Sequence, residues 1–334
     1  MLALGLASGS AQSATIGELA RATVPVTDSS EREFMRGLSA ALEVVVVKLT
    51  GNSKVLQSGA LRDLLNRAKQ YNTVYGYEKS PDGGLQLRAD FDLPAVSGVL
   101  RQQGLAVWGR QRPELLAWLI ITDSTGRYAT PTVAQKPLFE ALEHQAALRA
   151  IPLRHPVVDS TNAALMTPTT AEDDLLEELT ATRSGQSAPV ILIGLVTQNP
   201  DSTWRARWRL QIDLEREEWQ ATNAQAAPMV IAGIDRAVDS TAKQFVHPEI
   251  AGAASDVELL VDDVQTADDY GRALNYLSDL DSVATLNVRK VEGARVTFAI
   301  KARGGLSALV QVISFGRVLQ PVADHPSLFT LVGH

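Results

Sequence analysis

The sequence contains no cysteine among its 334 residues. This excludes disulfides, thiolate nucleophiles and the cysteine to which bacterial lipoproteins attach their lipid. An excess of positive charge is also lacking, since 31 Lys and Arg stand against 38 Asp and Glu, with a net charge of −7 and a pI near 5.3. Because nucleic-acid phosphates are bound by clustered basic side chains, this composition argues against a general nucleic-acid-binding protein.

Long apolar runs and common catalytic motifs are missing too. No segment has the ~18 uninterrupted apolar residues that a membrane-spanning helix needs. The sequence contains no phosphate-binding loop, no dinucleotide-binding fingerprint and no nucleophile elbow. The five histidines have no spacing typical of metal ligands, so we expect neither a metal nor an organic cofactor. They are His144, His155, His247, His325 and His334.

Three pairs of adjacent acidic residues are present, at 173–174, 262–263 and 268–269. Neighbouring carboxylates on a helix point about 100° apart, and those on a strand point to opposite faces. General acid–base catalysis needs two carboxyl groups that are directed at one substrate. The sequence therefore does not favour a catalytic role for these pairs.

The first fourteen residues, MLALGLASGSAQSA, are small and apolar, and they fit the small-x-small rule for signal peptidase cleavage. A basic segment before the apolar one is absent. Two interpretations remain open, a signal-peptide-like segment over residues 1–14 or an N-terminal extension. We expect export, with a mature N-terminus between Gln12 and Thr15.

A helix is predicted from Glu31 to Thr50, although it contains four consecutive valines. Its apolar residues recur every three or four positions, which is the helical and not the strand period. Ser30 and Glu33 form a capping-box pattern at the start, and Gly51 is suited to end the helix. We further predict a strand at ATVPV, a helix over 53–71, a hairpin around 81–84 and a helix over 94–103. These elements form a first module over residues 15–110.

Two stretches carry a resemblance to a known family. They are VPVTDSSEREFMRGLSAALEVVVVKLTGN and LAVWGRQRPELLAWL, which contain the short patterns LTGN and WG-x-x-RP. In this order they resemble the uncharacterised proteobacterial envelope family called domain of unknown function 2066, from about Ala22 to Val322. The resemblance implies an exported protein, and it supplies no catalytic residues. Gly109 and Pro113, in the second stretch, suggest a linker between modules.

The second module, residues 114–250, alternates apolar runs with helical patterns. Predicted strands lie at 115–123, 151–158, 190–197 and 203–213 and near Trp219, and predicted helices lie at 137–149, 170–182 and 229–245. The run VILIGLVT is continuously apolar, as in a central strand that is covered on both faces. We predict a three-layer α/β module. Its order of elements resembles the anticodon-binding-like domain at the N-terminus of TolB, by topology alone.

The third module, residues 255–323, has a β-α-β-β-α-β pattern. This is the pattern of ferredoxin-like folds. The whole chain is thus predicted to be an α+β protein of three modules.

The segment WRARWRL contains the most unusual polar pattern. On a strand, Arg205, Arg207 and Arg209 would share one face, and Trp204, Ala206, Trp208 and Leu210 the other. The arginines could pair with Glu215, Glu217 or Glu218 on the next strand. Alternatively, they could form an interaction surface for an acidic partner, a phospholipid headgroup or a glycan phosphate.

These observations predict a non-enzymatic, soluble periplasmic protein that acts as an interaction or assembly accessory in the bacterial cell envelope. Its expected partners are other envelope proteins. The alternative is a hydrolase or ligand-binding enzyme with its site in the loop from Asp159 to Thr170, beside the carboxyl end of the central strand.

Overall fold

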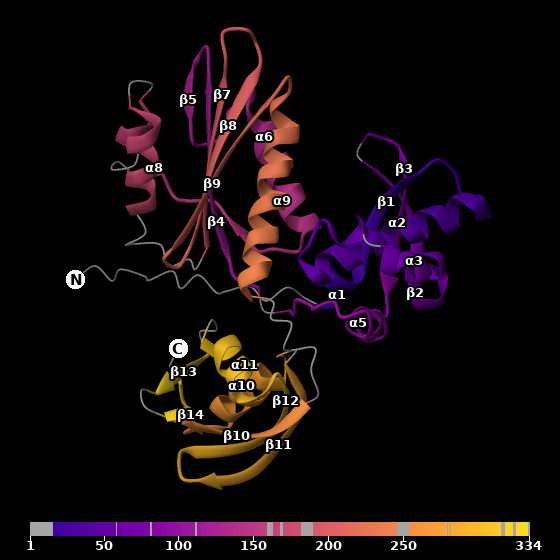
Figure 1. Ribbon diagram of the computed structural model, residues 1–334, viewed down its shortest axis with the longest axis vertical. Coiled ribbons are helices and arrows are strands. Elements are labelled where there is room, and N and C mark those ends of the chain that lie inside the picture. Colours follow the sequence, from indigo (N-terminus) through magenta and orange to yellow (C-terminus); the bar gives the residue numbers. More distant parts are fainter. Residues whose placement is uncertain are drawn as a thin grey trace.

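The computed structural model contains three units, each with its own sheet and its own hydrophobic core (Figure 1). The α+β class that the sequence predicted is confirmed. Among the described residues, no helix is long and apolar enough to cross a membrane. The structure describes residues 16–57, 59–80, 82–110, 112–158, 163–167, 170–181, 190–245, 254–278, 280, 282–314, 318–322 and 325–332.

The first unit is a three-stranded antiparallel sheet in the order β1-β3-β2, with the long helix α2 packed on one face. Leu87, Ala89 and Phe91 of β3 point into the core under α2, and the residues between them face the other way. The elements are α1 (Ile16–Ala20), β1 (Arg21–Val26), α2 (Glu31–Thr50), β2 (Asn72–Lys79), β3 (Leu85–Phe91) and α5 (Leu93–Gln102).

Helix α2 begins and ends where the sequence predicted. The Ser30 hydroxyl accepts the Glu33 N–H at 3.4 Å, and Gly51 ends the helix in the left-handed conformation, with φ 64°. The second bond of the capping box is redirected, because the Glu33 carboxylate accepts the N–H of Thr27 at 2.9 Å. The Ser30 N–H donates instead to Asp28, at 2.8 Å.

The helix predicted over residues 53–71 is wrong as one continuous element. It is divided into η1 (Val55–Gln57), η2 (Gly59–Leu61), α3 (Arg62–Asn66) and α4 (Ala68–Tyr71). Arg67 leaves the helical region, with φ −104° and ψ 22°, and so separates α3 from α4. Leu61, Leu64 and Ala68 are nevertheless buried, so the predicted apolar residues reach the core by a broken path.

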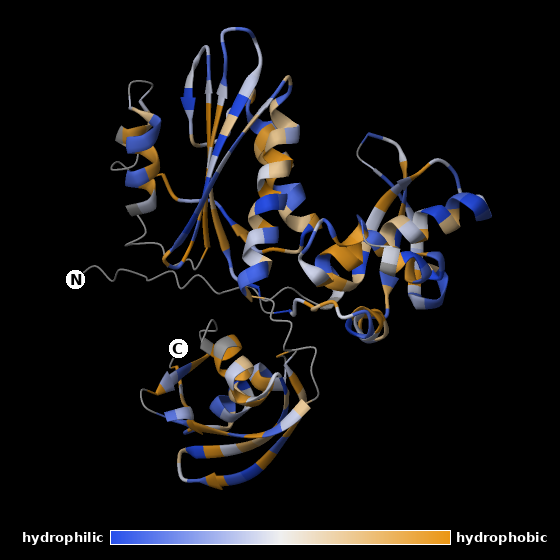
Figure 2. Cartoon of the chain, in the orientation of Figure 1, coloured by the Kyte–Doolittle hydropathy of each residue, from blue (hydrophilic) through white to orange (hydrophobic). Residues whose placement is uncertain are grey.

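The second unit has three layers, as predicted. Helices α6 and α9 cover one face of the sheet β5-β4-β7-β8-β9, and α8 covers the other (Figure 1). The central strands are apolar along their length and buried on both sides (Figure 2). The elements are β4 (Leu115–Asp123), β5 (Gly126–Tyr128), α6 (Lys136–Leu148), β6 (Leu153–Arg154), η3 (Ala164–Met166), α8 (Glu172–Ala181), β7 (Val190–Gln198), β8 (Trp204–Ile212), β9 (Glu215–Asn223) and α9 (Ala226–Phe245).

The strand predicted over residues 151–158 is reduced to the two residues of β6, which pairs with β4. Pro152 and Pro156 flank it. Neither has an N–H group to donate to a strand ladder, so the paired segment cannot extend far in either direction.

The third unit follows the predicted order of elements through β13, and a further strand then follows. The sheet order is β11-β12-β10-β14-β13, and β14 takes the place beside β10, in parallel orientation. A ferredoxin-like sheet would place β13 there, so the predicted topology fails at the last strand, and the unit extends beyond residue 323. Phe329 and Leu331 of β14 are core residues. The elements are β10 (Ala254–Asp262), α10 (Ala267–Ser278), β11 (Val283–Glu292), β12 (Arg295–Arg303), α11 (Gly305–Ser314), β13 (Leu319–Val322) and β14 (His325–Leu331).

Candidate functional site: the arginine stripe and the junction of the first two units

The three arginines of β8 lie on one face of the sheet, against the acidic helix α8, while Ala206, Trp208 and Leu210 are buried in the core on the opposite face. Each arginine has a carboxylate partner. Arg205 pairs with Glu172 at 2.7 Å, and Arg207 pairs with Asp173 at 2.6 Å. Arg209, whose side chain is only 5% exposed, contacts Glu177 at 2.9 Å and Glu218 at 2.7 Å. The arginine stripe therefore ties α8 and β9 to β8.

Of the three partners proposed from the sequence, Glu218 pairs with the stripe. Glu217 lies on the other face of β9, where it pairs with Arg236, and Glu215 accepts a hydrogen bond from Gln244. Burial raises the pKa of Glu218, but the hydrogen bonds and charges of Arg209 and Arg207 outweigh it and lower that pKa below its ordinary value. The acids of α8 were missed because nothing in the spacing shows that this helix crosses over β8.

Replacing Arg205, Arg207 and Arg209 together with Gln tests whether the stripe holds α8. The partner carboxylates all retain contact with solvent, and those of Asp173 and Glu177 are more than half exposed. We therefore expect a loss of roughly 1 to 3 kcal/mol in the free energy of unfolding, most of it from buried Arg209. Amide hydrogen exchange should accelerate in α8 and not in α9. An unchanged exchange rate in α8 together with lost binding to anionic envelope material would instead identify the stripe as an interaction surface.

The two sequence patterns LTGN and WG-x-x-RP meet at the junction of the first and second units. The Trp108 N–H donates to Leu49 O at 2.5 Å, and the Arg112 guanidinium stacks on the Trp108 ring, with 4.4 Å between Cζ and the ring centroid. Arg112 is 5% exposed and donates to the backbone carbonyls of Lys48 and Arg149. The segment predicted to be a linker is thus a buried clamp.

Gly51 is required at this junction for two reasons. Its φ of 64° is unfavourable for other residues, and a Cβ there would lie 2.4 Å from the Ala242 Cβ and 2.6 Å from Trp108 Cε3. The closing turn of α2 therefore packs directly on α9 and on the ring of Trp108. A side chain at position 51 would force the two units apart.

Arg149 forms the second half of the clamp. Its side chain is 2% exposed, and it pairs with Asp235 at 2.7 Å and Asp239 at 2.6 Å, both on α9. It also donates to Gly51 O at 2.9 Å, while Asp239 accepts from the N–H and hydroxyl of Ser53. This network joins α6, α9 and the end of α2. No local sequence pattern indicates this network, because its members are distant along the chain.

Lys48 is buried beside the clamp. Its ammonium group donates to Glu18 O at 2.9 Å and to Arg21 O at 2.7 Å. Burial, with a contribution from the charge of Arg112, lowers the pKa of Lys48 to about 8. A neutral amine still has two N–H groups, which suffice for these two carbonyls.

The low pKa of Lys48 predicts a dependence of stability on pH. The folded state binds this proton less tightly than the unfolded state, whose lysine pKa is 10.5. Lys48 therefore destabilises the fold below pH 8, and stability increases as the pH rises from about 8 to 10.5. Relative to the Lys48→Met variant, the wild-type free energy of unfolding should rise by about 3 kcal/mol over this window, measured by urea titration at several pH values. If the difference in the free energy of unfolding between the wild type and Lys48→Met does not change with pH, the lowered pKa of Lys48 is contradicted.

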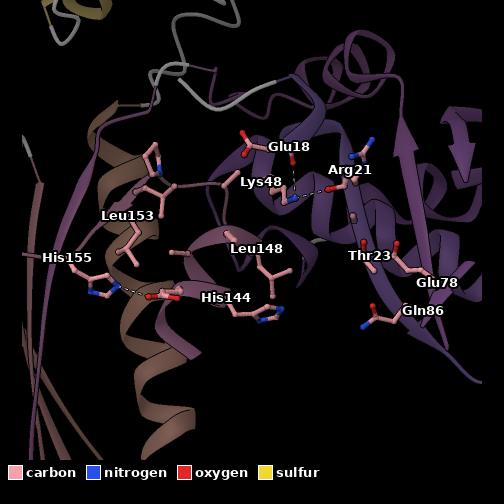
Figure 3. A pocket seen from close by; sticks show the side chains of 17 residues that line it. Glu18, Arg21, Thr23, Lys48, Glu78, Gln86, His144, Leu148, Leu153 and His155 are labelled. Carbon is pink, nitrogen blue, oxygen red and sulfur yellow. Dashed lines mark hydrogen bonds and ion pairs between the residues drawn. The ribbon is translucent and has the colours of Figure 1, made fainter. Parts of the chain in front are cut away.

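A cleft of about 770 Å³ lies between the first two units, next to Lys48. One side is the face of the three-stranded sheet opposite α2, and the other is α6 with the segment that follows it (Figure 3). Figure 3 shows Thr23, Glu78 and Gln86 on the first side and His144 and Leu148 on the second. His155 also lines the cleft and contacts Glu143 at 3.0 Å. The lining therefore combines both signs of charge with amide, hydroxyl and apolar groups.

The remaining residues considered from the sequence lie elsewhere. In the loop from Asp159 to Thr170, residues 159–162 and 168–169 lie outside the described residues, so an enzyme site there stays a prediction. His247 and His334 also lie outside them, and His325 is exposed on β14. Within the described part of the chain, no group of three potential metal ligands is present. The expectation of no cofactor remains untested.

One member of each pair of adjacent acids makes a structural contact. Asp173 pairs with Arg207, and Asp262 pairs with Arg295. Asp269 accepts hydrogen bonds from the N–H and hydroxyl of Thr266 at the start of α10. Each of these three carboxylates has a partner of its own, on β8, on β12 or at the start of α10.

Residues 13–109 match the family model described as Domain of unknown function (DUF8605). No curated protein matches. Among solved structures, the N-terminal domain of Protein Y from Thermus thermophilus is 17% identical, with a TM-score of 0.13, over 22% of this chain and 80% of that one. An uncharacterized protein is 10% identical, with a TM-score of 0.18, over 40% of this chain and 91% of that one.

Proposed function

We propose that the protein is a non-enzymatic binding protein of the bacterial cell envelope, exported to the periplasm, where it acts as an interaction or assembly accessory. The observation that carries this proposal is the cleft between the first two units. Its volume falls in the range of ligand-binding clefts, and the clamp of Arg112 and Arg149 fixes its two sides relative to each other. Such a rigid cleft loses little conformational entropy when it binds.

The occupant that fits best is a polar polypeptide segment of an envelope partner. Carboxylates, a histidine pair and amide groups line the cleft alongside the apolar side chains of Leu148 and Leu153. A peptide can offer both hydrogen-bond donors and acceptors together with short apolar groups. The resemblance of the LTGN and WG-x-x-RP patterns to an envelope family supports the location.

The proposal is tested by crosslinking in whole cells. A photo-crosslinking residue at position 86 or 144, inside the cleft, should capture defined envelope proteins that mass spectrometry can identify. The same residue at position 133, which is 94% exposed and remote from the cleft lining, serves as the control. Equal capture at all three positions, or none, would refute binding in the cleft.

Export is tested separately by N-terminal sequencing of the protein recovered from the periplasmic fraction. We expect a mature end between Gln12 and Thr15. An intact Met1 in the cytoplasmic fraction would overturn the location without bearing on the cleft.

A further inference from the structure

Strand β2 is an exposed edge of the first unit's sheet, and it carries apolar side chains. Within the part of the chain that the structure describes it pairs with β3 alone, and none of its eight residues is buried. Val74 is 56% exposed, Tyr75 53% and Tyr77 37%. Three of the large apolar side chains that the described surface exposes are thus gathered on one edge strand.

The other sheet edges carry features that discourage strand pairing. Strand β9 begins with four charged residues, and β11 contains Arg289, Lys290 and Glu292. Strand β13 is four residues long and contains a proline, and β5 is three residues long. On β1, the carbonyl of Arg21 is occupied by Lys48. Charge, proline and shortness are the usual means by which edges avoid pairing, and β2 lacks them over Asn72–Tyr77.

The orientation of the β2 backbone follows from the hairpin. The Ser80 N–H donates to Gly84 O at 2.9 Å, and Val74, Gly76 and Glu78 continue the same register opposite β3. In an antiparallel strand, the N–H and C=O groups of one residue both point toward the neighbouring strand on one side, and those of the next residue both point to the opposite side. The even-numbered residues therefore bond to β3, and Tyr75 and Tyr77 direct their N–H and C=O groups outward. A second strand can add to these groups.

We propose that β2 pairs with β2 of a second copy of this chain, antiparallel, about a two-fold axis at Gly76. In this register Tyr75 of each copy lies opposite Tyr77 of the other copy. These two tyrosines are the residues whose backbone N–H and C=O groups face outward. The register places Val74 opposite Glu78 and Thr73 opposite Lys79, so no like charges oppose each other. The self-complementary sequence favours a second copy over an unrelated segment as the occupant.

The aromatic side chains support this register. Tyr75 already packs on Phe34 of α2, with 4.6 Å between ring centroids, and lies 6.4 Å from Tyr77. In the dimer the four tyrosines would form one group on the face that carries Phe34 in each copy, with Tyr75 of each strand opposite Tyr77 of the other. Cross-strand aromatic pairs are among the more stabilising contacts of antiparallel sheets.

The absence of native cysteine allows a direct test with Gly76→Cys. A Cβ at Gly76 would meet nothing closer than Arg88 Nη2 at 3.8 Å, so the substitution fits. At the two-fold axis, the two residues 76 form a pair without backbone hydrogen bonds, with Cα atoms about 4.5 Å apart, which a disulfide can span. We expect nearly complete covalent dimer under mild oxidation. Val74→Cys is the register control, since its two copies would lie roughly 13 Å apart, and it should stay uncrosslinked.

Tyr77→Pro tests the same strand pairing without a covalent crosslink. The monomer does not need the outward N–H of Tyr77, so the variant should fold. In the dimer, however, the proline removes two hydrogen bonds, one from each copy. Sedimentation should show a dimer for the wild type and for Tyr77→Phe, and a monomer for Tyr77→Pro. A wild type that sediments as a monomer at its highest soluble concentration overturns the proposal. So does a dimer in which Val74→Cys crosslinks as well as Gly76→Cys. If Tyr77→Pro unfolds, the two cysteine variants decide.

Discussion

Replacing Arg149 with Met is expected to cost about 3 to 5 kcal/mol of folding free energy, the range for removing one partner of a buried ion pair. The side chain is 2% exposed, and its loss leaves Asp235 and Asp239 without their cation and Gly51 O without its donor. Met keeps most of the apolar stem, so the change isolates the charge and its hydrogen bonds from the packing.

The effect should be localised to the junction. Because Arg149 connects α6 and α9 to the end of α2, the first and second units are expected to unfold together in the wild type and separately in Arg149→Met. Urea titration, followed by hydrogen exchange in each unit, measures both quantities. The matched control is Arg289→Met, whose pair with Glu258 is 65% and 49% exposed, and which should cost less than about 1 kcal/mol. A similar small loss for Arg149→Met would show that the clamp does not hold the units together.

Local patterns predicted most of the elements correctly because they depend on neighbouring residues. The period of three to four in α2 outweighed the strand preference of four valines, and Ser30 and Gly51 fixed its ends. Alternation of apolar and polar residues likewise places Leu87, Ala89 and Phe91 of β3 in the core. Segment 55–71 was predicted as part of one continuous helix because its apolar residues keep helical spacing, and that spacing carries no signal for the break at Arg67.

The candidate site could not be predicted, because it is built from contacts between distant residues. Arg112 and Lys48 are 64 positions apart, and Arg149 and Gly51 are 98 apart. Gly109 and Pro113 suggested a linker, as such residues commonly do, and only the packing of Trp108 shows otherwise. The same limit applies to β14, which displaces β13 from β10 although both segments have ordinary strand patterns.

Among substitutions that disturb the packing of the core, we expect those around Trp208 to cost the most folding free energy. Its ring is 1% exposed and lies between two glycines, Gly194 on β7 and Gly233 on α9. A Cβ at Gly194 would lie 2.2 Å from the ring, and one at Gly233 would lie 2.3 Å from it. The two glycines therefore let α9 approach the sheet with a full indole between them.

Gly233→Ala is expected to destabilise the second unit by about 1 to 3 kcal/mol, although Ala favours helices over Gly. The matched control is Gly271→Ala in α10, where a Cβ would meet nothing within 4 Å. That change should stabilise the protein by roughly 0.5 to 1 kcal/mol, because only the helical preference remains. If Gly→Ala lowers the free energy of unfolding in α9 and raises it in α10, the effect of packing is separated from that of helix propensity.

A double-mutant cycle then tests whether the ring is the cause. Trp208→Leu alone should cost about 3 kcal/mol through the cavity that it leaves. In the Trp208→Leu background, Gly233→Ala has room for its methyl group, so its cost should disappear, which is a coupling of roughly 1 to 3 kcal/mol in urea titrations. If the two losses simply add, the methyl group at position 233 is opposed by the backbone of the sheet and not by the indole, and Gly233 is required by the approach of α9 itself.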